Sequence, residues 1–257
     1  ITMASWKTAL KKTGFADMVE VGLGGDMTAA AEAEEWAEAY KEGKKMTTSC
    51  CPAFVNMIKQ HYPTLLDNMS TTVSPMCGVS RWLKQKDPET ITVFIGPCIA
   101  KKSESLDLNI TGNADYVLTF GEIRAMMRAK GVELEPEENT YQESSVFGKR
   151  FGNGGGVAAA VVQCFKEMGE DISPEVMKCS GGAECKKALL LLKAGKLPAD
   201  FVEGMACVGG CVGGPSKHKT ELEAKKARDL LIGQADDREV HANLKNLGVD
   251  QVAMHRH

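Results

Sequence analysis

Three cysteine-containing segments constrain this sequence more than any other feature. Each follows an apolar, strand-like stretch and is interrupted by Gly or Pro: Thr48–Pro52, Gly96–Glu104 and Glu203–Gly214. Glycine lets the backbone approach a bulky inorganic group, and its amides can donate hydrogen bonds to sulfides. Cys207 and Cys211 are separated by three residues, two of them glycine, so one loop can direct both sulfurs toward one centre. One cysteine from each of the other segments would complete the four thiolates that a [4Fe–4S] cluster needs.

Strand-like and helix-like segments alternate along the chain. Short apolar runs predict strands over residues 18–23, 46–49, 91–95, 116–118, 176–179 and 201–205. Helical patterns cover residues 28–41, 52–61, 121–130, 157–168 and 183–194, and two polar helices close the chain. This alternation predicts an α/β fold with mostly parallel sheets flanked by helices. Ligand sites in such folds lie where strands end, and all three cysteine segments are predicted to lie there.

The composition excludes several classes of protein. The 257 residues, 43% of them hydrophobic and 25% charged, are ordinary for one large globular domain or a tightly fused two-lobed one. The net charge of -3 gives no basic footprint for nucleic acid, and no apolar run approaches the ~20 residues that span a bilayer. Nine cysteines, odd in number and clustered, suit reduced thiols better than a disulfide scaffold. We therefore expect a cytoplasmic protein with no nucleic-acid partner and no membrane anchor.

Other cysteines have simpler explanations than metal binding. Cys77 and Cys164 are each predicted to be buried packing residues, because a lone buried cysteine behaves as a small hydrophobic side chain. Cys179 and Cys185 flank a Gly-Gly turn, and their spacing matches no common cluster pattern, so structural thiols are favoured there. Zinc is the main inorganic alternative to iron–sulfur. It usually binds paired C-x-x-C cysteines, which this sequence lacks.

At these segments the sequence resembles the catalytic H-domain of the iron-only, or [FeFe], hydrogenases. The three cysteine segments are similar to that family's three signature motifs, in the same order. Further similarities extend along nearly the whole chain, at Tyr62–Pro63, Ser74–Pro75, Asp115–Thr119 and Phe151–Val157. The resemblance implies one two-lobed H-domain over residues 1–257, with the cluster between its lobes, its N-terminal edge missing and its C-terminal helices at about 216–257. The closing Met254–His257 and the lack of ferredoxin-like accessory clusters resemble the family's smaller branches, including sensory ones.

The resemblance implies a particular cofactor. Cys51, Cys98, Cys207 and Cys211 would bind a [4Fe–4S] cubane, and Cys211 would also bridge to a diiron unit carrying CO, cyanide and an azadithiolate. This assembly, the H-cluster, interconverts two protons and two electrons with H2. The implied partners are H2, protons, an external electron carrier such as ferredoxin or a partner subunit, and the maturation proteins that install the diiron unit.

The resemblance also implies roles for nearby side chains. Lys101 would face a cyanide of the diiron unit, a role that suits a compact cation with three donors. Glu104, one helical turn later, would orient Lys101, and Met205 would lie near the diiron unit. Cys50 would donate protons, because a cysteine beside a metal site can cycle between thiol and thiolate near neutral pH.

From Cys50 the resemblance implies a proton relay through Glu32, Ser70 and Glu35 to solvent. Glu32 and Glu35 are three residues apart and would share one face of a helix. An Ala- and Glu-rich helix commonly displays solvated carboxylates, so this reading remains an alternative. The register relative to Cys50 is what favours the relay.

The sequence departs from the family pattern at three positions. Gly96 stands where a methionine is usual, Met76 where a polar side chain is common, and Phe54 where tryptophan is frequent. The first two change packing and hydrogen bonding around the diiron ligands, so they affect catalytic bias and rate more than cluster binding. Three functions follow: a hydrogenase, which we favour, a slow hydrogen-sensing or regulatory H-cluster protein, and a non-catalytic iron–sulfur assembly protein. Lys101 and Cys50 argue against the third, because a plain cubane needs neither.

Overall fold

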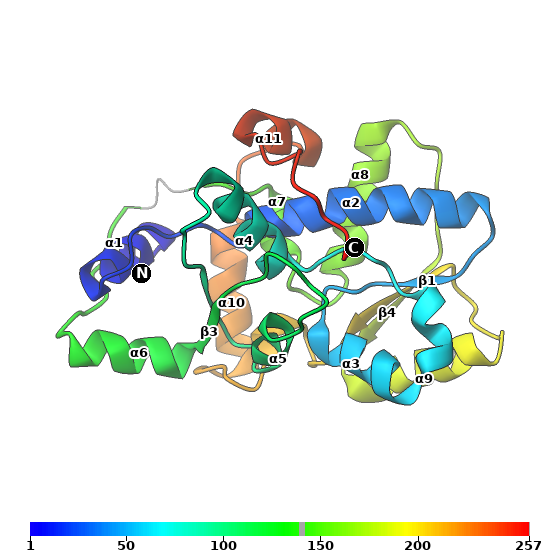
Figure 1. Cartoon of the computed structure of the whole chain (residues 1–257), viewed down its shortest axis with the longest axis horizontal. Helices are drawn as coiled ribbons and strands as arrows, with labels where there is room; N and C mark the ends of the chain where they lie inside the picture. Colours follow the sequence, from blue (N-terminus) through cyan, green and yellow to red (C-terminus); the bar gives the residue numbers. More distant parts are fainter. Residues whose placement is uncertain (139–141, 257) are drawn as a thin grey trace.

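The computed structural model of the chain describes residues 1–138 and 142–256 and has an α/β fold (Figure 1). Its strands are β1 (Met46–Thr47), β2 (Val93–Gly96), β3 (Tyr116–Thr119), β4 (Val176–Ser180) and β5 (Phe201–Met205). One sheet has the order β1-β5-β4 and the other pairs β2 with β3, and every pairing is parallel. Figure 1 shows β3 and β4 in opposite halves of the molecule. The predicted fold class, parallel sheets flanked by helices, is confirmed.

Helices surround both sheets. The α-helices are α1 (Met3–Thr13), α2 (Gly22–Lys41), α3 (Pro52–His61), α4 (Pro75–Lys86), α5 (Ala100–Ser105), α6 (Phe120–Ala129), α7 (Val146–Arg150), α8 (Gly156–Met168), α9 (Gly182–Lys193), α10 (Glu221–Ile232) and α11 (Val240–Leu247). The 3-10 helices are η1 (Pro63–Asn68) and η2 (Cys211–Gly213). Helices α1, α4, α5 and α7 lie outside the ranges that the sequence predicts. None of the described helices combines the length and the apolar character needed to cross a membrane.

Helix starts follow the strand ends closely, which places the cysteine segments at one edge. Cys51 is the extended residue before α3, whose first residue is Pro52, and proline favours that first helical position. Thr119 ends β3 and caps α6 through a reciprocal capping box with Glu122. Because β1, β2 and β5 are followed directly by cysteine segments, the carboxyl ends of both sheets supply the candidate site.

The strand predicted over residues 18–23 is wrong, because the glycine run beginning at Gly22 belongs to helix α2. A Cβ atom on Gly24 would lie 2.2 Å from the carbonyl oxygen of Pro75. A Cβ atom on Gly25 would lie 2.9 Å from the Cβ of Phe151. The glycines therefore let α2 pack directly on its neighbours, including α4. A local reading of glycine as a turn signal misses this tertiary role.

The main hydrophobic core lies between α2, β5 and α8. Trp36 stacks on Phe201 with ring centroids 4.1 Å apart, and both rings are fully buried. Cys77 and Cys164 are fully buried in this cluster, where packing residues are expected. Cys179 and Cys185 lie in a second cluster under α3 and α9. The second core forms the floor beneath the cysteine segments.

Candidate functional site

Four cysteines from the three segments gather where β1, β2 and β5 end. Desolvation of its sulfur raises the pKa of Cys211 to about 12, although the residue as a whole is exposed, and the neighbouring Cys51, Cys98 and Cys207 contribute to the rise. Burial also raises the pKa of Cys207, with further contributions from Cys51 and Cys98. All four are free thiols. These electrostatic effects indicate that the four cysteines are neighbours.

Glycines shape the loop that carries Cys207 and Cys211. The amide of Gly210 donates to the carbonyl of Cys207 at 3.1 Å, and the amide of Cys211 donates to Gly152 at 2.7 Å. Gly210 has φ +86°, and a Cβ atom there would lie 2.4 Å from the Gly152 oxygen. Only glycine accommodates this conformation and this close approach together. The loop is thereby tied to the segment before α8.

The donor set fits a [4Fe–4S] cluster better than a zinc ion. Within residues 1–138 and 142–256, no group of three or more His, Cys, Asp or Glu side chains is placed to hold a single metal ion. A zinc site needs its ligands within roughly 2.0–2.3 Å of one atom. A cubane places its four thiolates farther apart, one at each iron. Four neighbouring thiols that are not gathered on a single point match that requirement.

Lys101 and Glu104 form a buried ion pair beside Cys50. The Lys101 ammonium donates to Glu104 Oε2 at 2.5 Å and to the Cys50 carbonyl at 3.3 Å. Burial disfavours the ammonium, but the charge and hydrogen bond of Glu104 outweigh it and raise the pKa of Lys101. Glu104 Oε1 is buried and has no hydrogen-bond partner among the described residues. The pair therefore keeps a fixed cation next to the four thiols.

Cys50 is buried and held as a neutral thiol. Burial raises its pKa well above the usual range, and the nearby Glu32 adds to this, while Lys101 opposes it. The physical reason is that a thiolate would be desolvated next to a carboxyl group. Cys50 therefore keeps its proton unless a strong proton acceptor lies next to it.

Two of the predicted relay residues, Ser70 and Glu35, are hydrogen-bonded to each other, and a third, Glu32, is buried near Cys50. Glu32 is completely buried, and burial raises its pKa to about 8. The amide of Ser49 donates to Glu32 Oε1 at 3.3 Å, while Glu32 Oε2 has no hydrogen-bond partner among the described residues. The hydroxyl of Ser70 donates to Glu35 Oε2 at 2.5 Å. Glu32 is thus the buried member of the set and Glu35 the partly exposed one.

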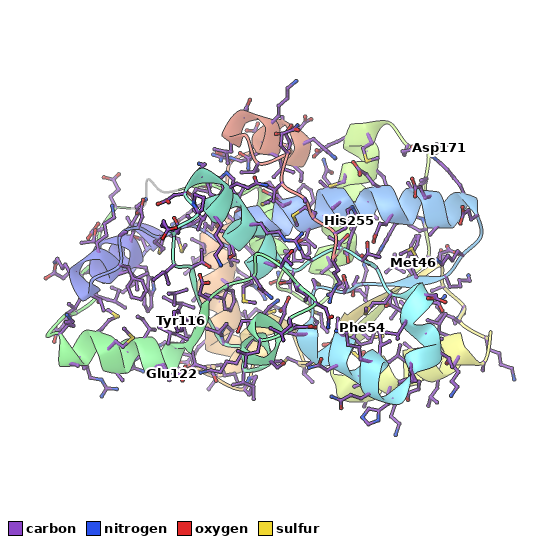
Figure 2. The ribbon with its side chains drawn as sticks, in the orientation of Figure 1. Met46, Phe54, Tyr116, Glu122, Asp171 and His255 are labelled. Atoms are coloured by element: carbon purple, nitrogen blue, oxygen red, sulfur yellow. The ribbon has the colours of Figure 1, made fainter. Side chains whose placement is uncertain are left out.

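The network continues beyond Glu35 to residues that sequence reasoning missed. The amide of Thr71 donates to both carboxylate oxygens of Glu35, at 3.1 and 3.2 Å. His255, labelled in Figure 2, lies with its Nδ1 3.3 Å from Glu35 Oε1. From the sequence, residues 254–257 are noted only for their resemblance to the smaller branches of the family, with no role predicted for His255. His257 lies outside the described residues. No local signal could have linked His255 to Thr71, because 184 positions separate them.

Apolar side chains form the wall next to Cys211. A Cβ atom on Gly96 would lie 2.8 Å from the ring of Phe94, so this ring fills the space of a side chain at position 96. Met76 is buried against Phe94. Met76, Phe94 and Cys211 all line a cavity of about 700 Å³. The two departures at positions 76 and 96 thus produce one consistent apolar surface.

Three further positions complete the surroundings. Met205 is buried at the end of β5, as expected for a residue near the cofactor. A Cβ atom on Gly204 would lie 2.2 Å from the ring of Phe54, so this ring, labelled in Figure 2, lies flat on the strand. Ser74 Oγ is buried and has no partner in the described part of the chain. This orphaned hydroxyl precedes α4 and remains available to a bound group.

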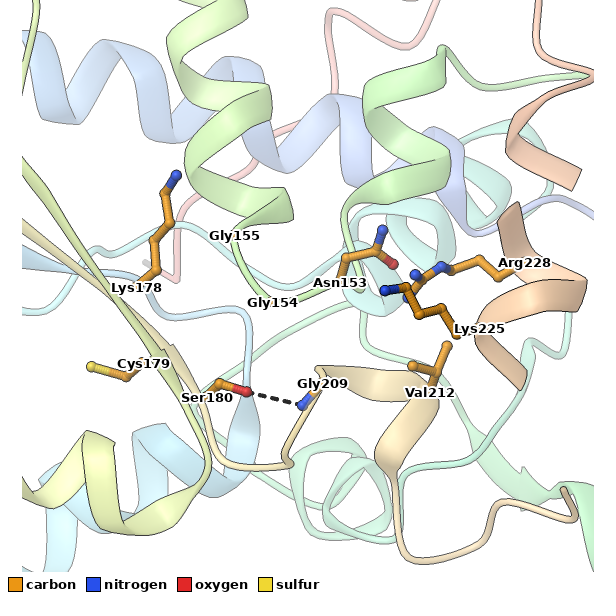
Figure 3. Close-up of a pocket in the computed structure, with 10 residues that line it drawn as sticks. All are labelled: Asn153, Gly154, Gly155, Lys178, Cys179, Ser180, Gly209, Val212, Lys225 and Arg228. Carbon is orange, nitrogen blue, oxygen red and sulfur yellow. Dashed lines mark hydrogen bonds between the residues drawn. The ribbon is translucent and has the colours of Figure 1, made fainter. Parts of the chain in front are cut away.

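A second pocket, of about 390 Å³, lies on the other side of the cysteine loop (Figure 3). Ser180 Oγ accepts a hydrogen bond from the amide of Gly209 at 2.9 Å, which closes the pocket floor. Its lining includes Lys178, Lys225 and Arg228, and Arg228 also bonds Asp229 at 3.1 Å. The outer face of the loop between Cys207 and Cys211 is therefore basic.

Comparison with known proteins gives consistent matches. A family model described as "Iron only hydrogenase large subunit, C-terminal domain" matches residues 1–215. The chain is 30% identical to the periplasmic [Fe] hydrogenase large subunit of Nitratidesulfovibrio vulgaris, over 83% of this chain and 62% of that protein. It is 28% identical to iron hydrogenase 1 of Clostridium pasteurianum, over 90% and 49%. It is 24% identical to a probable cytosolic Fe–S cluster assembly factor of Brugia malayi, over 83% and 57%. The chain thus spans between 49% and 62% of these relatives.

Solved structures share the fold. A [FeFe]-hydrogenase HydA, from a study of stepwise H-cluster assembly, superposes with a TM-score of 0.78 at 22% identity, over 96% of this chain and 82% of that one. An apo cysteine-to-histidine variant of HydA1 from Chlamydomonas reinhardtii gives 0.76 at 21% identity, over 99% and 85%. Both have the architecture described above.

Proposed function

The chain belongs to the iron-only hydrogenase family, in the C-terminal domain of its large subunit, and on this basis we propose that it is an [FeFe] hydrogenase that interconverts protons and H2 at an H-cluster. What supports the proposal is the pairing of four neighbouring cysteines with a set of buried proton-exchanging groups near Cys50. A cubane alone needs no such set. A hydrogenase does, because it must move protons as well as electrons.

The chain's own residues would hold the cofactor in defined ways. Cys51, Cys98, Cys207 and Cys211 would supply the four thiolates that hold the [4Fe–4S] part of the cofactor. When bound, the H-cluster supplies the redox chemistry that joins protons and electrons into H2. The apolar wall excludes bulk water, which strengthens electrostatic interactions inside the site. The protein otherwise contributes charge, position and protons.

Lys101 would orient an anionic ligand of the diiron unit. Its buried ammonium is fixed by Glu104 and the Cys50 carbonyl, which leaves one donor free of those two contacts. Ser74 Oγ offers a further hydroxyl without a partner among the described residues. Both groups suit small polar ligands such as cyanide.

Protons would move by short steps between neighbouring groups. Cys50 as a neutral thiol gives its proton to the reacting centre and takes another from Glu32, whose raised pKa keeps it protonated at neutral pH. The Ser70 hydroxyl, which is hydrogen-bonded to Glu35, would carry protons from Glu35 toward Glu32. Each transfer would take place when donor and acceptor come within hydrogen-bond distance.

Electrons would come from a separate carrier. The basic rim formed by Lys178, Lys225 and Arg228 lies against the cysteine loop and suits an acidic carrier such as ferredoxin. Dedicated maturation proteins would install the diiron unit. The nine free thiols support a reducing, cytoplasm-like compartment.

A slow hydrogen sensor is the second candidate. The apolar surface of Met76, Phe94 and Gly96 removes the polar side chain and the methionine that the family commonly places there, which favours altered turnover. The assembly-protein alternative has support from relatives of that name, such as the one at 24% identity. The buried Lys101 and the relay weigh against it.

Reconstitution with a diiron unit separates these functions. We expect infrared bands from CO and cyanide, and H2 evolution from reduced viologen that falls about 100-fold or more in Cys50→Ala. Bands with no activity above that of Cys50→Ala would favour the sensor. A protein that holds its cubane but develops no such bands would contradict the H-cluster and favour the assembly protein.

A further inference from the structure

The relay does not stop at Glu35, because a histidine from the far end of the chain reaches the same carboxyl group. His255 Nδ1 lies 3.3 Å from Glu35 Oε1 and 2.8 Å from Thr71 Oγ1, and Thr71 Oγ1 also bonds Glu35 Oε1. The side chain of His255 is 44% exposed, against 15% for Glu35. His255 is therefore the member of this group that meets solvent most fully.

Backbone contacts fix His255 at this position. It forms an antiparallel bridge with Thr72, and the amide of Arg256 donates to the Thr71 carbonyl at 3.0 Å. From the other side, Arg81 Nη1 donates to the His255 carbonyl at 2.8 Å. The C-terminal segment thus runs alongside residues 71–72, which carry the end of the relay. Figure 2 shows His255 beside α2, the helix that carries Glu35.

The charged groups around this segment do not compete for its role. Glu35 faces it from α2, Arg81 from α4, and Arg256 follows it in the chain. Arg81 donates to backbone carbonyls and Arg256 donates to the Ser49 carbonyl at 2.9 Å. Arginine stays protonated at all ordinary pH values. Histidine is the side-chain type that takes up and releases protons near neutral pH.

We propose that His255 is the group through which the relay from Cys50 to Glu35 exchanges protons with solvent. The proposal rests on the proposed function for its biological purpose, but the proton path itself can be tested alone. The imidazolium gives its Nδ1 proton to Glu35, directly or through the Thr71 hydroxyl. The neutral ring is then reprotonated from water, so each cycle moves one proton inward and no electrons.

A purely structural role makes different predictions. If His255 only holds the C-terminal segment in place, its removal lowers the stability of the protein and changes proton exchange at all buried thiols alike. If it exchanges protons, its removal slows proton arrival at Cys50 specifically, and a small diffusible base restores the rate. The experiment must therefore measure the rate of proton exchange at the Cys50 thiol and compare it with the rate at a thiol elsewhere in the protein.

Infrared spectroscopy of thiol S–H bands after transfer to D2O provides that reading in the full chain without the cofactor. The Cys50 band is identified by its loss in Cys50→Ala. We expect His255→Ala to slow exchange at Cys50 about tenfold and added imidazole to restore it. Exchange at the fully buried Cys164 stays unchanged. The matched variant is His241→Ala, which removes a histidine whose Nδ1 lies 2.8 Å from Glu167, and it leaves Cys50 exchange unchanged.

The matured protein gives a second reading. H2 evolution from reduced viologen should fall about tenfold in His255→Ala and recover with imidazole. His255→Gln, which keeps a hydrogen-bond donor but cannot titrate, should behave like His255→Ala.

Two results would overturn the proposal. One is unchanged exchange at Cys50 in His255→Ala. The other is an equal change in the H/D exchange rates of Cys50 and Cys164 in His255→Ala, with no effect of imidazole. That result would indicate a structural role for His255. The two proposals can fail separately. If the wild-type protein evolves no H2 while exchange at Cys50 still depends on His255, the proposed function is contradicted and the role of His255 is supported.

Discussion

The four-thiol site and the proton relay are neighbours that are built in different ways. The thiol site is assembled from backbone: loops at the ends of β1, β2 and β5 present cysteines, and glycines such as Gly210 allow the close approach. The relay residues Glu32 and Glu35 both lie on α2, where the amide of Ser49 donates to Glu32, and Ser70 and Thr71 donate to Glu35. In the first region, backbone loops surround the space for a bulky group. In the second region, individual side chains contact one another.

This difference predicts separable failures. Removing a thiol takes away one of four ligands, so the cofactor should be lost while the fold remains. Removing a relay residue leaves every ligand in place, so the cofactor should stay while proton movement or the local charge balance changes. Variants in each region, compared with matched controls, can test whether the two effects are separate.

The largest effect is expected for Cys211→Ala. A cubane needs four thiolates, so iron should fall about tenfold from a content of about four atoms per chain. The control is Cys164→Ala, which removes a fully buried thiol from the main core. That variant should lose stability but keep its iron. Iron and sulfide analysis after reconstitution makes the measurement, and equal iron in the two variants would mean that Cys211 is not a ligand.

The next effect concerns the ion pair that joins the two regions. Glu104→Ala leaves the Lys101 ammonium buried beside Cys50 without its carboxylate, which should lower the free energy of unfolding by about 3–5 kcal/mol. Urea unfolding of the protein without its cofactor measures this loss. Adding Lys101→Met should recover most of it, because the uncompensated charge is then gone.

A surface pair provides the control for that measurement. Lys41 and Glu170 lie 2.9 Å apart, and Lys41 is 58% exposed. Glu170→Ala should cost only about 0–1 kcal/mol. If Glu104→Ala costs no more than Glu170→Ala, Lys101 is not held as a charged group in the site.

Features formed by neighbouring residues could be predicted from the sequence. The strand ending at Met205 and the helix starting at Pro52 follow from apolar runs, Pro and Gly signals within a few residues. Cys51, Cys207 and Cys211 could be expected to lie together because the parallel strands β1 and β5 end at one edge of a sheet. For these three the local pattern and the tertiary arrangement carry the same information, whereas Cys98 follows β2 in the other sheet.

Features formed by distant residues could not be predicted. The glycines at the start of α2 act through a contact with Pro75, so a local pattern misread them as the end of a strand. Phe94 fills the space beside Gly96 only because of how its ring lies across the strand end. His255 reaches Glu35 through a backbone bridge to Thr72. In each case the partner is fixed by packing and has no signature in the neighbouring sequence.

A further effect is expected at Glu32, and it is one of pH dependence. Burial raises the pKa of Glu32 to about 8 in the folded protein, whereas an unfolded glutamate has a pKa of roughly 4.3. Between these values the folded state holds a proton that the unfolded state releases. The contribution of Glu32 to stability is therefore complete below about pH 4 and is lost as pH rises toward 8, by at most about 1.4 kcal/mol per pH unit. Glu32→Gln cannot titrate and should remove this slope.

Urea unfolding of the cofactor-free protein at about pH 5, 6.5 and 8 measures that slope, because linkage relates it to the protons released on unfolding. Glu38→Gln, on an exposed position of the same helix, is the matched control and should leave the slope unchanged. Equal slopes in the wild-type protein and Glu32→Gln would mean that Glu32 is ionised in the folded state. Glu32 would then have to take up a proton from the solvent side before it could supply one to Cys50.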